Sequence, residues 1–557
     1  MVARETLETP GRHRVATAEK RYGQHYTPRE LAEFLARQTW AAMAHRPPSI
    51  TVIDPACGDG ELLIAFANVA SREGYTGTVN LVGYEIDPQA ADAARTRLAA
   101  LKAKTTIRRA DFLIAQRALS TGCAQVIITN PPYVRTQHLG QETSQLLAQE
   151  FSLTGRVDLT HPFVAVASRL LDGNGVLGLL CSNRFLTTMS GENIRRTLTT
   201  GELEVREIYD LGDTKLFKAA VLPAIIVASK GEKPAFPARF VSTYQSSKPP
   251  CGPPLFDALL SKSDQDATIN GRHYEVKVGT FTPPFLTTTP WRLSSPESDR
   301  WLDTIAEHTW KTFGDIAKIR VGIKTTADKV FLHHDWENKA PQVESDLLRP
   351  LIVQKNIAPW KTADNLHMRV LYPYNLDSET RQTLDLNDWP GARDYFHSHE
   401  DALRQRRYVT DGGREWFEIW VPQKPALWAV PKIVFPDISE RPRFALDSSG
   451  AVVNGNCYWI SLKDIGDEDL AYLMLGVANS SLGLRYYDEV CGNRLYSGKR
   501  RWITQYVKRL PLPYPETANA QRIIGLSREL VHAGTSAREH QTQLDSLVNA
   551  AFSAART

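Results

Sequence analysis

The sequence predicts an α/β protein with an open sheet, followed by a second domain of α+β type. Up to about residue 233, short apolar runs of strand length alternate with segments whose apolar residues have helical spacing. Four of these runs end in polar residues, at the edge where open α/β sheets bind ligands. From about residue 291 the chain changes to short strands and turns, with aromatic residues mixed among basic ones.

The composition describes an ordinary globular protein. Its 557 residues are 42% hydrophobic and 23% charged, and the net charge of +4 argues neither for nor against a nucleic-acid partner. The six cysteines lie far apart without a CxxC pair, which disfavours a zinc site or disulfides and predicts a reducing compartment. Residues 1–23 lack an apolar signal core, and the longest apolar run, 219–228, is only of strand length. We therefore expect a cytoplasmic protein without membrane contact or a bound metal.

The first predicted element after a polar arm (residues 1–20) is a helix. Thr27 has the residue type of a helix N-cap, and Pro28 that of the first helical residue. Leu31 and Phe34 begin the apolar stripe that this helix buries. A capped helix with no further role is the plain alternative for this segment.

A glycine-containing loop follows the first strand, 51–53. The loop begins Asp54, Pro55, Ala56, Cys57 and continues with two glycines, so its backbone can approach a ligand at the start of the next helix. The spacing is not GxGxxG, and the loop opens with an acid, which disfavours a phosphate-bearing dinucleotide. A cationic or zwitterionic ligand fits this chemistry better.

The second and third strands also end in acids. Glu85 follows the glycine loop by about 25 residues, where an open α/β fold places the carboxylate that accepts from ribose hydroxyls. Ile86 offers an apolar face to an adenine ring, and Asp111 and Phe112 repeat the pattern after the third strand. Either acid alone is more simply explained as a solvated strand end. Four consecutive strands that end in such residues predict a ligand site.

The fourth strand, 126–129, ends in Asn130, Pro131, Pro132 and Tyr133. Asn130 offers a side-chain carbonyl, and the prolines stiffen the turn and remove two N–H donors. Tyr133 adds a flat ring. Rigid acceptors beside a stacking face suit a planar group that carries an NH₂, such as adenine, cytosine or a glutamine amide. An ordinary Asn-Pro turn is the alternative for the tetrapeptide taken alone.

This ordered set of residues resembles the γ-class DNA adenine-N6 methyltransferases, the group that includes the TaqI methyltransferase. The resemblance implies a Rossmann-like S-adenosylmethionine-dependent methyltransferase domain with a mixed sheet and a C-terminal α+β target-recognition domain. It implies that Thr27 and residues 54–57 hold the methionine end of S-adenosylmethionine, Glu85 its ribose and Asp111 the amine of its adenine. Further residues are expected at the cofactor: Ile86, Phe112, Asn130 and Phe163.

The resemblance also assigns residues to the target base. Asn130 and Pro131 are expected to accept the N–H groups of the amine, and Tyr133 to stack on a base extruded from the duplex. Phe217 matches the aromatic residue that meets the target base. Core packing is the alternative reading of both Phe163 and Phe217.

The expected domains are a catalytic unit at 21–233, a connector at 234–290, a target-recognition domain at 291–515 and two packing helices at 516–557. The connector is rich in Pro, Ser and Thr, which predicts little regular structure. Two basic clusters with aromatic neighbours are candidates for DNA contact, although solvated charge explains any one of them. Their arginines are Arg404, Arg407, Arg500 and Arg501.

The expected activity is site-specific methylation of adenine in double-stranded DNA. The same tetrapeptide occurs in enzymes that methylate a release-factor glutamine or an RNA base, but those are much shorter and lack a large basic, aromatic second domain. A DNA-binding protein that no longer turns over is a further alternative. A fused restriction enzyme is disfavoured, because no nuclease carboxylate-lysine cluster is evident. The resemblance implies a partnership with a separate restriction endonuclease, and we expect the chain to act as a monomer.

Overall fold

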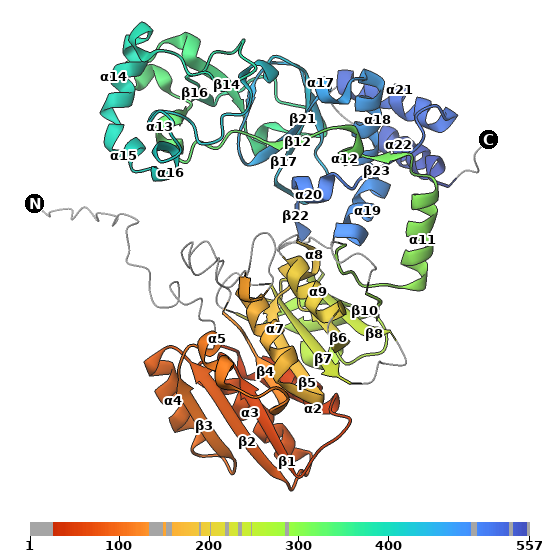
Figure 1. Cartoon of the computed structure of the whole chain (residues 1–557). Helices are drawn as coiled ribbons and strands as arrows, with labels where there is room; N and C mark the ends of the chain where they lie inside the picture. The colour runs from red at the N-terminus through yellow and green to blue at the C-terminus, as the bar shows by residue number, and fades with distance from the viewer. Residues whose placement is uncertain are drawn as a thin grey trace, which may run out of the picture. The chain divides into compact units, whose positions relative to one another are not determined.

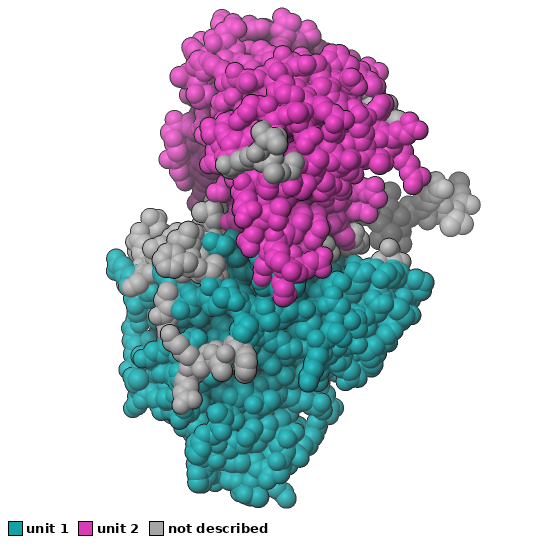
Figure 2. Space-filling view, turned by 90° about the vertical axis from the view of Figure 1, so that its right-hand side faces the viewer, with its two compact units in different colours: residues 1–295 teal, residues 296–557 magenta. Residues whose placement is uncertain are grey.

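The computed structural model describes residues 26–132, 149–151, 159–188, 191–200, 202–217, 222–231, 237–246, 248–283, 289–491, 498–533 and 538–553. The chain divides into two compact units, residues 1–295 and residues 296–557 (Figure 2). Each unit has hydrophobic cores of its own, so each is held together by its own apolar packing.

The first unit is built on one mixed sheet of ten strands (Figure 1). They are β1 (Ser49–Asp54), β2 (Thr78–Glu85), β3 (Lys104–Arg109), β4 (Ala124–Thr129), β5 (Leu171–Ser182), β6 (Leu203–Asp210), β7 (Pro223–Lys230), β8 (Ala238–Gln245), β9 (Gln265–Ile269) and β10 (Arg272–Phe281). Their order is β3-β2-β1-β4-β5-β7-β6-β8-β10-β9. The first five in this order are parallel, and β7 is antiparallel to both of its neighbours.

Helices cover both faces of this sheet, as its alternating side chains require. The main ones are α2 (Arg29–Ala41), α3 (Glu61–Arg72), α4 (Pro88–Leu98), α7 (Thr160–Leu170) and α9 (Glu192–Thr200). In β4, Val126 and Ile128 pack in the core with α2, α3 and α4. Ile127, between them, packs in the opposite core with α7 and α9. The predicted Rossmann-like fold with a mixed sheet is confirmed.

The interpretation of residues 234–290 as a connector with little regular structure is wrong. This segment supplies β8, β9, β10 and the short helix α10 (Leu255–Ala258), and its strands extend the sheet of the first unit. Phe240, Tyr274 and Val276 are buried in strands whose other residues are partly polar. The prolines lie mainly in the turns, and the average composition of the segment concealed this period-two pattern. The first unit therefore reaches residue 295, past the expected end of the catalytic unit at residue 233.

The second unit combines small sheets with helices. Its five-stranded sheet has the order β12 (Ile319–Val321), β21 (Cys457–Ser461), β17 (Lys432–Pro436), β19 (Ala445–Asp447), β15 (Trp360–Lys361). Its four-stranded sheet has the order β13 (Leu332–His333), β16 (Arg369–Leu371), β14 (Leu348–Ile352), β20 (Val452–Val453). Two strand pairs complete it: β11 (Lys311–Thr312) with β23 (Pro511–Leu512), and β18 (Ile438–Ser439) with β22 (Arg500–Arg501). The predicted α+β class is confirmed.

Helices close one side of the second unit's core. They are α11 (Pro296–Glu307), α18 (Glu468–Ala478), α19 (Ser481–Cys491), α21 (Ala518–Ala533) and α22 (Arg538–Ala551). Gly476 of α18 lets α21 approach closely, since a Cβ there would lie 2.5 Å from Ile523 Cγ2 and 2.6 Å from Ser527 Oγ. In the described part of the chain, no helix combines the length and apolar character needed to cross a bilayer.

Candidate active site

The candidate site lies where the strand order of the sheet reverses. From β1 the chain proceeds outward to β2 and β3, whereas β4 and β5 lie on the other side of β1. Such a switch point opens a crevice at the carboxyl ends of the two central strands. The loop after β1 begins at Asp54, and Asn130 follows β4 directly. The topology therefore brings together the strand-end residues predicted from the sequence.

The loop after β1 is held close to β2. Cys57 donates its backbone N–H to the Tyr84 carbonyl at 2.9 Å, and Gly60 donates to the Cys57 carbonyl at 2.8 Å. Gly60 has a φ of +88°, which favours glycine, and it directly precedes α3. A Cβ on Gly83 would lie 2.7 Å from Cys57 Sγ, so the loop packs against bare backbone of β2. Pro55 is buried and Ala56 is partly exposed.

The Glu85 carboxylate organises this loop. Its Oε2 accepts the Gly58 N–H at 2.9 Å, and its Oε1 accepts the Asp87 N–H at 2.8 Å. The residue is 7% exposed. Each carboxylate oxygen can accept a second hydrogen bond, so the contacts within the protein are compatible with acceptance from ribose hydroxyls. Ile86, the next residue, is half exposed.

Asp54 is buried beside this carboxylate. It accepts the Ala56 N–H at 3.1 Å and is 1% exposed. Burial raises the pKa of Asp54 to about 7, and the nearby charge of Glu85 acts in the same direction. Burial and these two carboxylates also raise the pKa of the Cys57 thiol, which makes it a poor nucleophile. A bound cation would relieve the repulsion between the acids, so the site suits a positively charged ligand.

Asn130 is tied to the segment that precedes α2. Its Nδ2 donates to Thr27 Oγ1 at 3.1 Å, across 103 residues of sequence. Because the amide nitrogen faces Thr27, the carbonyl oxygen Oδ1 points away from Thr27. The prediction that Thr27 caps α2 is wrong: α2 begins at Arg29, and Pro28 holds the N-cap position without a side-chain hydrogen bond. The Thr27 hydroxyl instead orients the side chain of Asn130.

Tyr26 is a site residue that the sequence reasoning missed. Its side chain is 53% exposed, and a Cβ built on Gly58 would lie 3.6 Å from its ring. The ring therefore lies over the glycine loop. The only sequence signal was its position next to Thr27.

The aromatic residues expected at the cofactor's adenine pack against one another. Phe112 and Phe163 are stacked, with ring centroids 5.7 Å apart and planes at 20°, and they are 2% and 7% exposed. Asp111 is exposed, and its Oδ1 accepts the Leu113 N–H at 2.9 Å, which caps the short helix α5 (Phe112–Ala115). Asp111 is thus the accessible member of this group.

Two residues expected at the target base have less support from the structure. Phe217 is 6% exposed and packs in the apolar core with α2 and α3, so its contact with a base stays a prediction. Tyr133 lies outside the described residues. Pro131 is buried and Asn130 is partly exposed at the end of β4.

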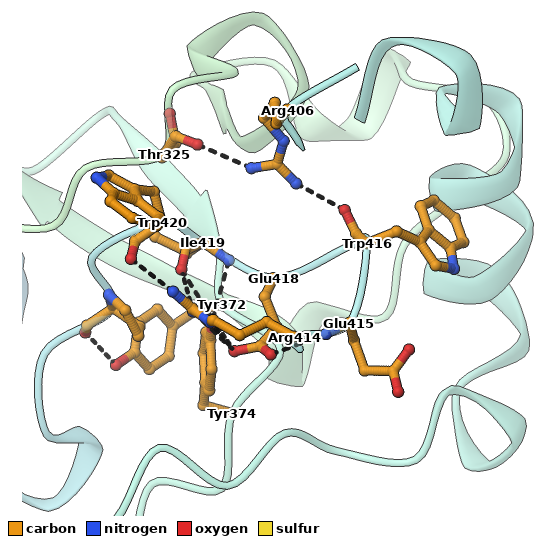
Figure 3. A network of polar contacts seen from close by, with 11 residues as sticks. Thr325, Tyr372, Tyr374, Arg406, Arg414, Glu415, Trp416, Glu418, Ile419 and Trp420 are labelled. Carbon is orange, nitrogen blue, oxygen red and sulfur yellow. Dashed lines mark hydrogen bonds and ion pairs between the residues drawn. The ribbon is translucent and has the colours of Figure 1, made fainter. Parts of the chain in front are cut away.

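The first basic cluster divides into one structural arginine and two surface arginines. Figure 3 shows Arg406, which is buried and donates to the carbonyls of Thr325 and Trp416 at 2.9 and 2.7 Å. Arg404 pairs with Glu400 at 2.6 Å. Arg407 is exposed and forms no ion pair with any described residue. Arg407 is therefore the arginine of this cluster that is available to a phosphate.

The second basic cluster is paired within the protein. Arg500 forms a two-point ion pair with Asp488, at 2.8 and 2.7 Å, and its side chain is 12% exposed. Arg501 pairs in the same way with Asp437, at 3.1 and 2.8 Å, and is 38% exposed. These contacts favour a structural role for Arg500 and Arg501, and their contact with DNA stays a prediction.

The fold and the strand-end residues together define the class: a Rossmann-like methyltransferase domain joined to a specificity domain. A family model described as N-6 DNA Methylase matches residues 12–248. A second, described as a TaqI-like C-terminal specificity domain, matches residues 372–512.

Two relatives cover nearly the whole chain. The Type II methyltransferase M.BanIII of Aneurinibacillus aneurinilyticus is 34% identical over 97% of this chain and 98% of its own length. The Type II methyltransferase M.BstVI of Geobacillus stearothermophilus is 25% identical over 96% of this chain and 97% of its own length. The chain therefore belongs to the Type II restriction-modification methyltransferases of the N-6 DNA methylase family.

A solved structure supports the fold of both units. The Type IIL restriction-modification enzyme MmeI, solved in complex with DNA, matches with a TM-score of 0.66. The match covers 97% of this chain and 78% of that chain at 14% sequence identity. At this identity, the likeness shows the fold alone.

Proposed function

We propose that this chain transfers the methyl group of S-adenosylmethionine to N6 of an adenine extruded from duplex DNA at a specific sequence. The observation that carries the proposal is the Asn130–Thr27 hydrogen bond at the β1/β4 switch point. It fixes an amide carbonyl at the edge of the sheet where β1 and β2 end in the buried acids Asp54 and Glu85. Acceptors for an amine and a site for a cation are thus adjacent.

The residues after β1 and β2 fit S-adenosylmethionine, which is a sulfonium and an amino acid. Asp54 has a raised pKa because it is buried and close to Glu85, so a positive charge is the natural counterpart. The glycine loop allows close approach of a ligand, and Asp111 is exposed and able to accept from an adenine amine. When bound, S-adenosylmethionine supplies an activated methyl group.

The protein contributes acceptors that act as charge develops. An aromatic amine is a weak nucleophile, because its lone pair is delocalised into the ring. Acceptance of its two N–H groups by Asn130 Oδ1 and the Pro131 carbonyl would turn the lone pair toward the methyl group. Positive charge then grows on the nitrogen, and the same two oxygens stabilise it in the transition state. The methylated, cationic amine loses its proton to water, so a general base is not required.

Base extrusion completes the substrate side of the proposal. Tyr133 is assigned to stack on the extruded base, which offsets the few kcal/mol that unstacking costs. A fluorescent adenine analogue at the target position tests this directly. Its emission should rise on binding to the wild type and rise much less with Tyr133→Ala; equal signals would remove the stacking role.

The DNA surface of the second unit is assigned to exposed basic and aromatic side chains. Arg407 and Tyr408 lie on α16 (Arg407–Thr410), and Tyr408 meets Trp420 edge to face with ring centroids 4.9 Å apart. The two rings are 46% and 37% exposed. Figure 3 shows that the loop with Trp420 is held by Arg414, which donates to the Trp420 carbonyl at 2.7 Å. A rigid aromatic pair next to an exposed cation suits contact with bases and phosphate.

The direct test of the catalytic assignment is Asn130→Ala, with transfer of labelled methyl to duplex DNA measured next to cofactor binding. We expect transfer to be abolished while cofactor affinity stays within a few fold. Asn80→Ala is the matched control, because the Asn80 side chain donates an exposed hydrogen bond to Ser49 near the other end of β2. Normal turnover by Asn130→Ala would refute the assignment.

The alternatives are separated by substrate. The wild-type protein should methylate duplex DNA in preference to RNA or a glutamine-containing peptide. Cofactor binding without transfer to any of the three would identify a catalytically silent DNA-binding protein. The biological role assigned to the chain is protection of host DNA from a separate restriction endonuclease, with the methyltransferase acting as a monomer. Loss of host viability on deletion of this gene, only when a linked endonuclease is active, tests that role.

A further inference from the structure

A cluster of metal-ligand side chains lies at the edge strand of the first unit's sheet. His273 and Asp266 come from the antiparallel pair β10 and β9, and Cys251 comes from the loop that precedes α10. The Cys251 sulfur, an Asp266 carboxylate oxygen and a His273 ring nitrogen all lie within 4.8 Å of one another. The cluster lies at the opposite edge of the sheet from β3, away from the switch point between β1 and β4.

The atoms of the cluster are spaced as ligands of one ion. His273 Nε2 lies 3.1 Å from Asp266 Oδ1, and Cys251 Sγ lies 3.8 Å from Asp266 Oδ2. Tetrahedral zinc with bonds of about 2.0–2.3 Å places its ligand atoms about 3.3–3.8 Å apart. Because the three ligand atoms lie within 4.8 Å of one another, they would have to approach by up to about 1 Å to converge on a shared ion.

His273 supplies independent evidence that a partner is required. The residue is 1% exposed, and neither of its ring nitrogens has a hydrogen-bond partner among the described residues. Nε2 lies 3.1 Å from Asp266 Oδ1 but forms no hydrogen bond with it. A buried imidazole without a partner is costly, and an ion between His273 and Asp266 would satisfy Nε2.

The loop that carries Cys251 is held in place. Prolines flank it on both sides, at 249–250 and 253–254, and restrict its backbone. Thr268 Oγ1 donates to the Cys251 carbonyl at 2.8 Å, and the Thr268 N–H donates to the Pro253 carbonyl at 2.9 Å. Gly252 has a φ of +90°, and a side chain there would collide with the Asp266 carbonyl. The sulfur is thus positioned before any ligand arrives.

We propose that Cys251, Asp266 and His273 bind a zinc ion, with water in the fourth position. Thiolate and imidazole ligands favour zinc over magnesium or calcium, which prefer oxygen ligands throughout. Lys248 Nζ lies 3.8 Å from Asp266 Oδ1 but only 3.0 Å from Glu275 Oε1, so it keeps an ion-pair partner when the metal takes Asp266. The sequence-based expectation of no zinc site considered only closely spaced cysteines, whereas these ligands converge through the fold.

The test measures zinc binding by the full chain, purified without a histidine tag and stripped with a chelator. Titration against a chromophoric zinc indicator gives stoichiometry and affinity, and cobalt gives a thiolate-to-metal charge-transfer band if sulfur is a ligand. Cys251→Ser and Asp266→Asn are the informative variants because both residues are at least partly exposed. Cys123→Ser and Asp264→Asn are matched controls outside the cluster, and Asp264 pairs with Lys277.

We expect one zinc per chain, a higher thermal midpoint with zinc, and at least tenfold weaker binding in Cys251→Ser and in Asp266→Asn. The cobalt charge-transfer band should be present in the wild type and in Cys123→Ser, and absent in Cys251→Ser. The proposal is overturned if the wild type takes up no zinc at micromolar concentrations. It is also overturned if either informative variant binds zinc within twofold of the wild type.

Discussion

The affinity for S-adenosylmethionine should depend on pH through Asp54. Burial holds the pKa of Asp54 at about 7 in the protein without ligand, against 3.8 for a solvated aspartate. A sulfonium and an ammonium group favour the ionised carboxylate. Affinity is therefore full above the raised pKa and is lost as the pH falls below it.

The magnitude follows from the titration. Asp54 is about half ionised at pH 7 and about one tenth ionised at pH 6, so affinity should fall roughly fivefold over this interval. Below about pH 6, the affinity for S-adenosylmethionine should fall by about tenfold per pH unit. This decline ends at the pKa of Asp54 in the complex, which the bound cation lowers. Burial of the ionised carboxylate costs about 4 kcal/mol in the unliganded protein, from the difference between about 7 and 3.8. Asp54→Asn should therefore raise the melting temperature at about pH 8 while it weakens cofactor binding.

The assay is calorimetric titration with S-adenosylmethionine between about pH 5.5 and pH 7.5. Asp54→Asn should bind weakly and with a flat pH profile. Asp59→Asn is the control from the same loop, because Asp59 pairs with Arg97 at 2.5 Å and should leave the pH dependence intact. A wild-type affinity that varies less than twofold over this range would rule out Asp54 as the titrating group, as would the same pH dependence in Asp54→Asn.

Three further predictions rest on single contacts. Thr27→Val removes the hydrogen bond that orients Asn130 and should lower the single-turnover rate of methyl transfer at saturating cofactor about five- to tenfold; an unchanged rate would contradict it. Arg407→Ala should weaken DNA binding and reduce by about one the slope of the logarithm of the binding constant against the logarithm of the salt concentration. Arg500→Ala should instead lower the melting temperature, because it breaks the ion pair with Asp488. The opposite pair of results would assign DNA contact to Arg500 and a structural role to Arg407. Gly476→Ala should destabilise the second unit by about 1–3 kcal/mol in urea unfolding, because α21 leaves no room for a methyl group; wild-type stability would show that the helices can separate.

The positions of the candidate residues at strand ends could be predicted, because each follows a local sequence pattern. Asp54, Glu85 and Asn130 each follow an apolar run, and parallel strands bring their carboxyl ends to one edge. The fold class followed from the same pattern. The strands after residue 234 were missed, because their alternation is short and the prolines of the intervening turns dominate the composition.

Partners that are distant in sequence could not be predicted. Arg500 and Arg501 are read from sequence as a basic surface, but Asp488 and Asp437 neutralise them in the fold. Thr27 has the residue type of a helix cap, yet its partner lies 103 residues away. In each case the pairing depends on tertiary packing, which no local pattern records.

The proposed activity is methylation of the exocyclic amine of adenine. The most direct measurement is mass spectrometry of nucleosides from plasmid DNA incubated with the protein and isotopically labelled S-adenosylmethionine. The predicted product is N6-methyldeoxyadenosine with the label in the methyl group. Labelled N4-methyldeoxycytidine, or unmethylated DNA after incubation with folded protein that binds the cofactor, would contradict the account.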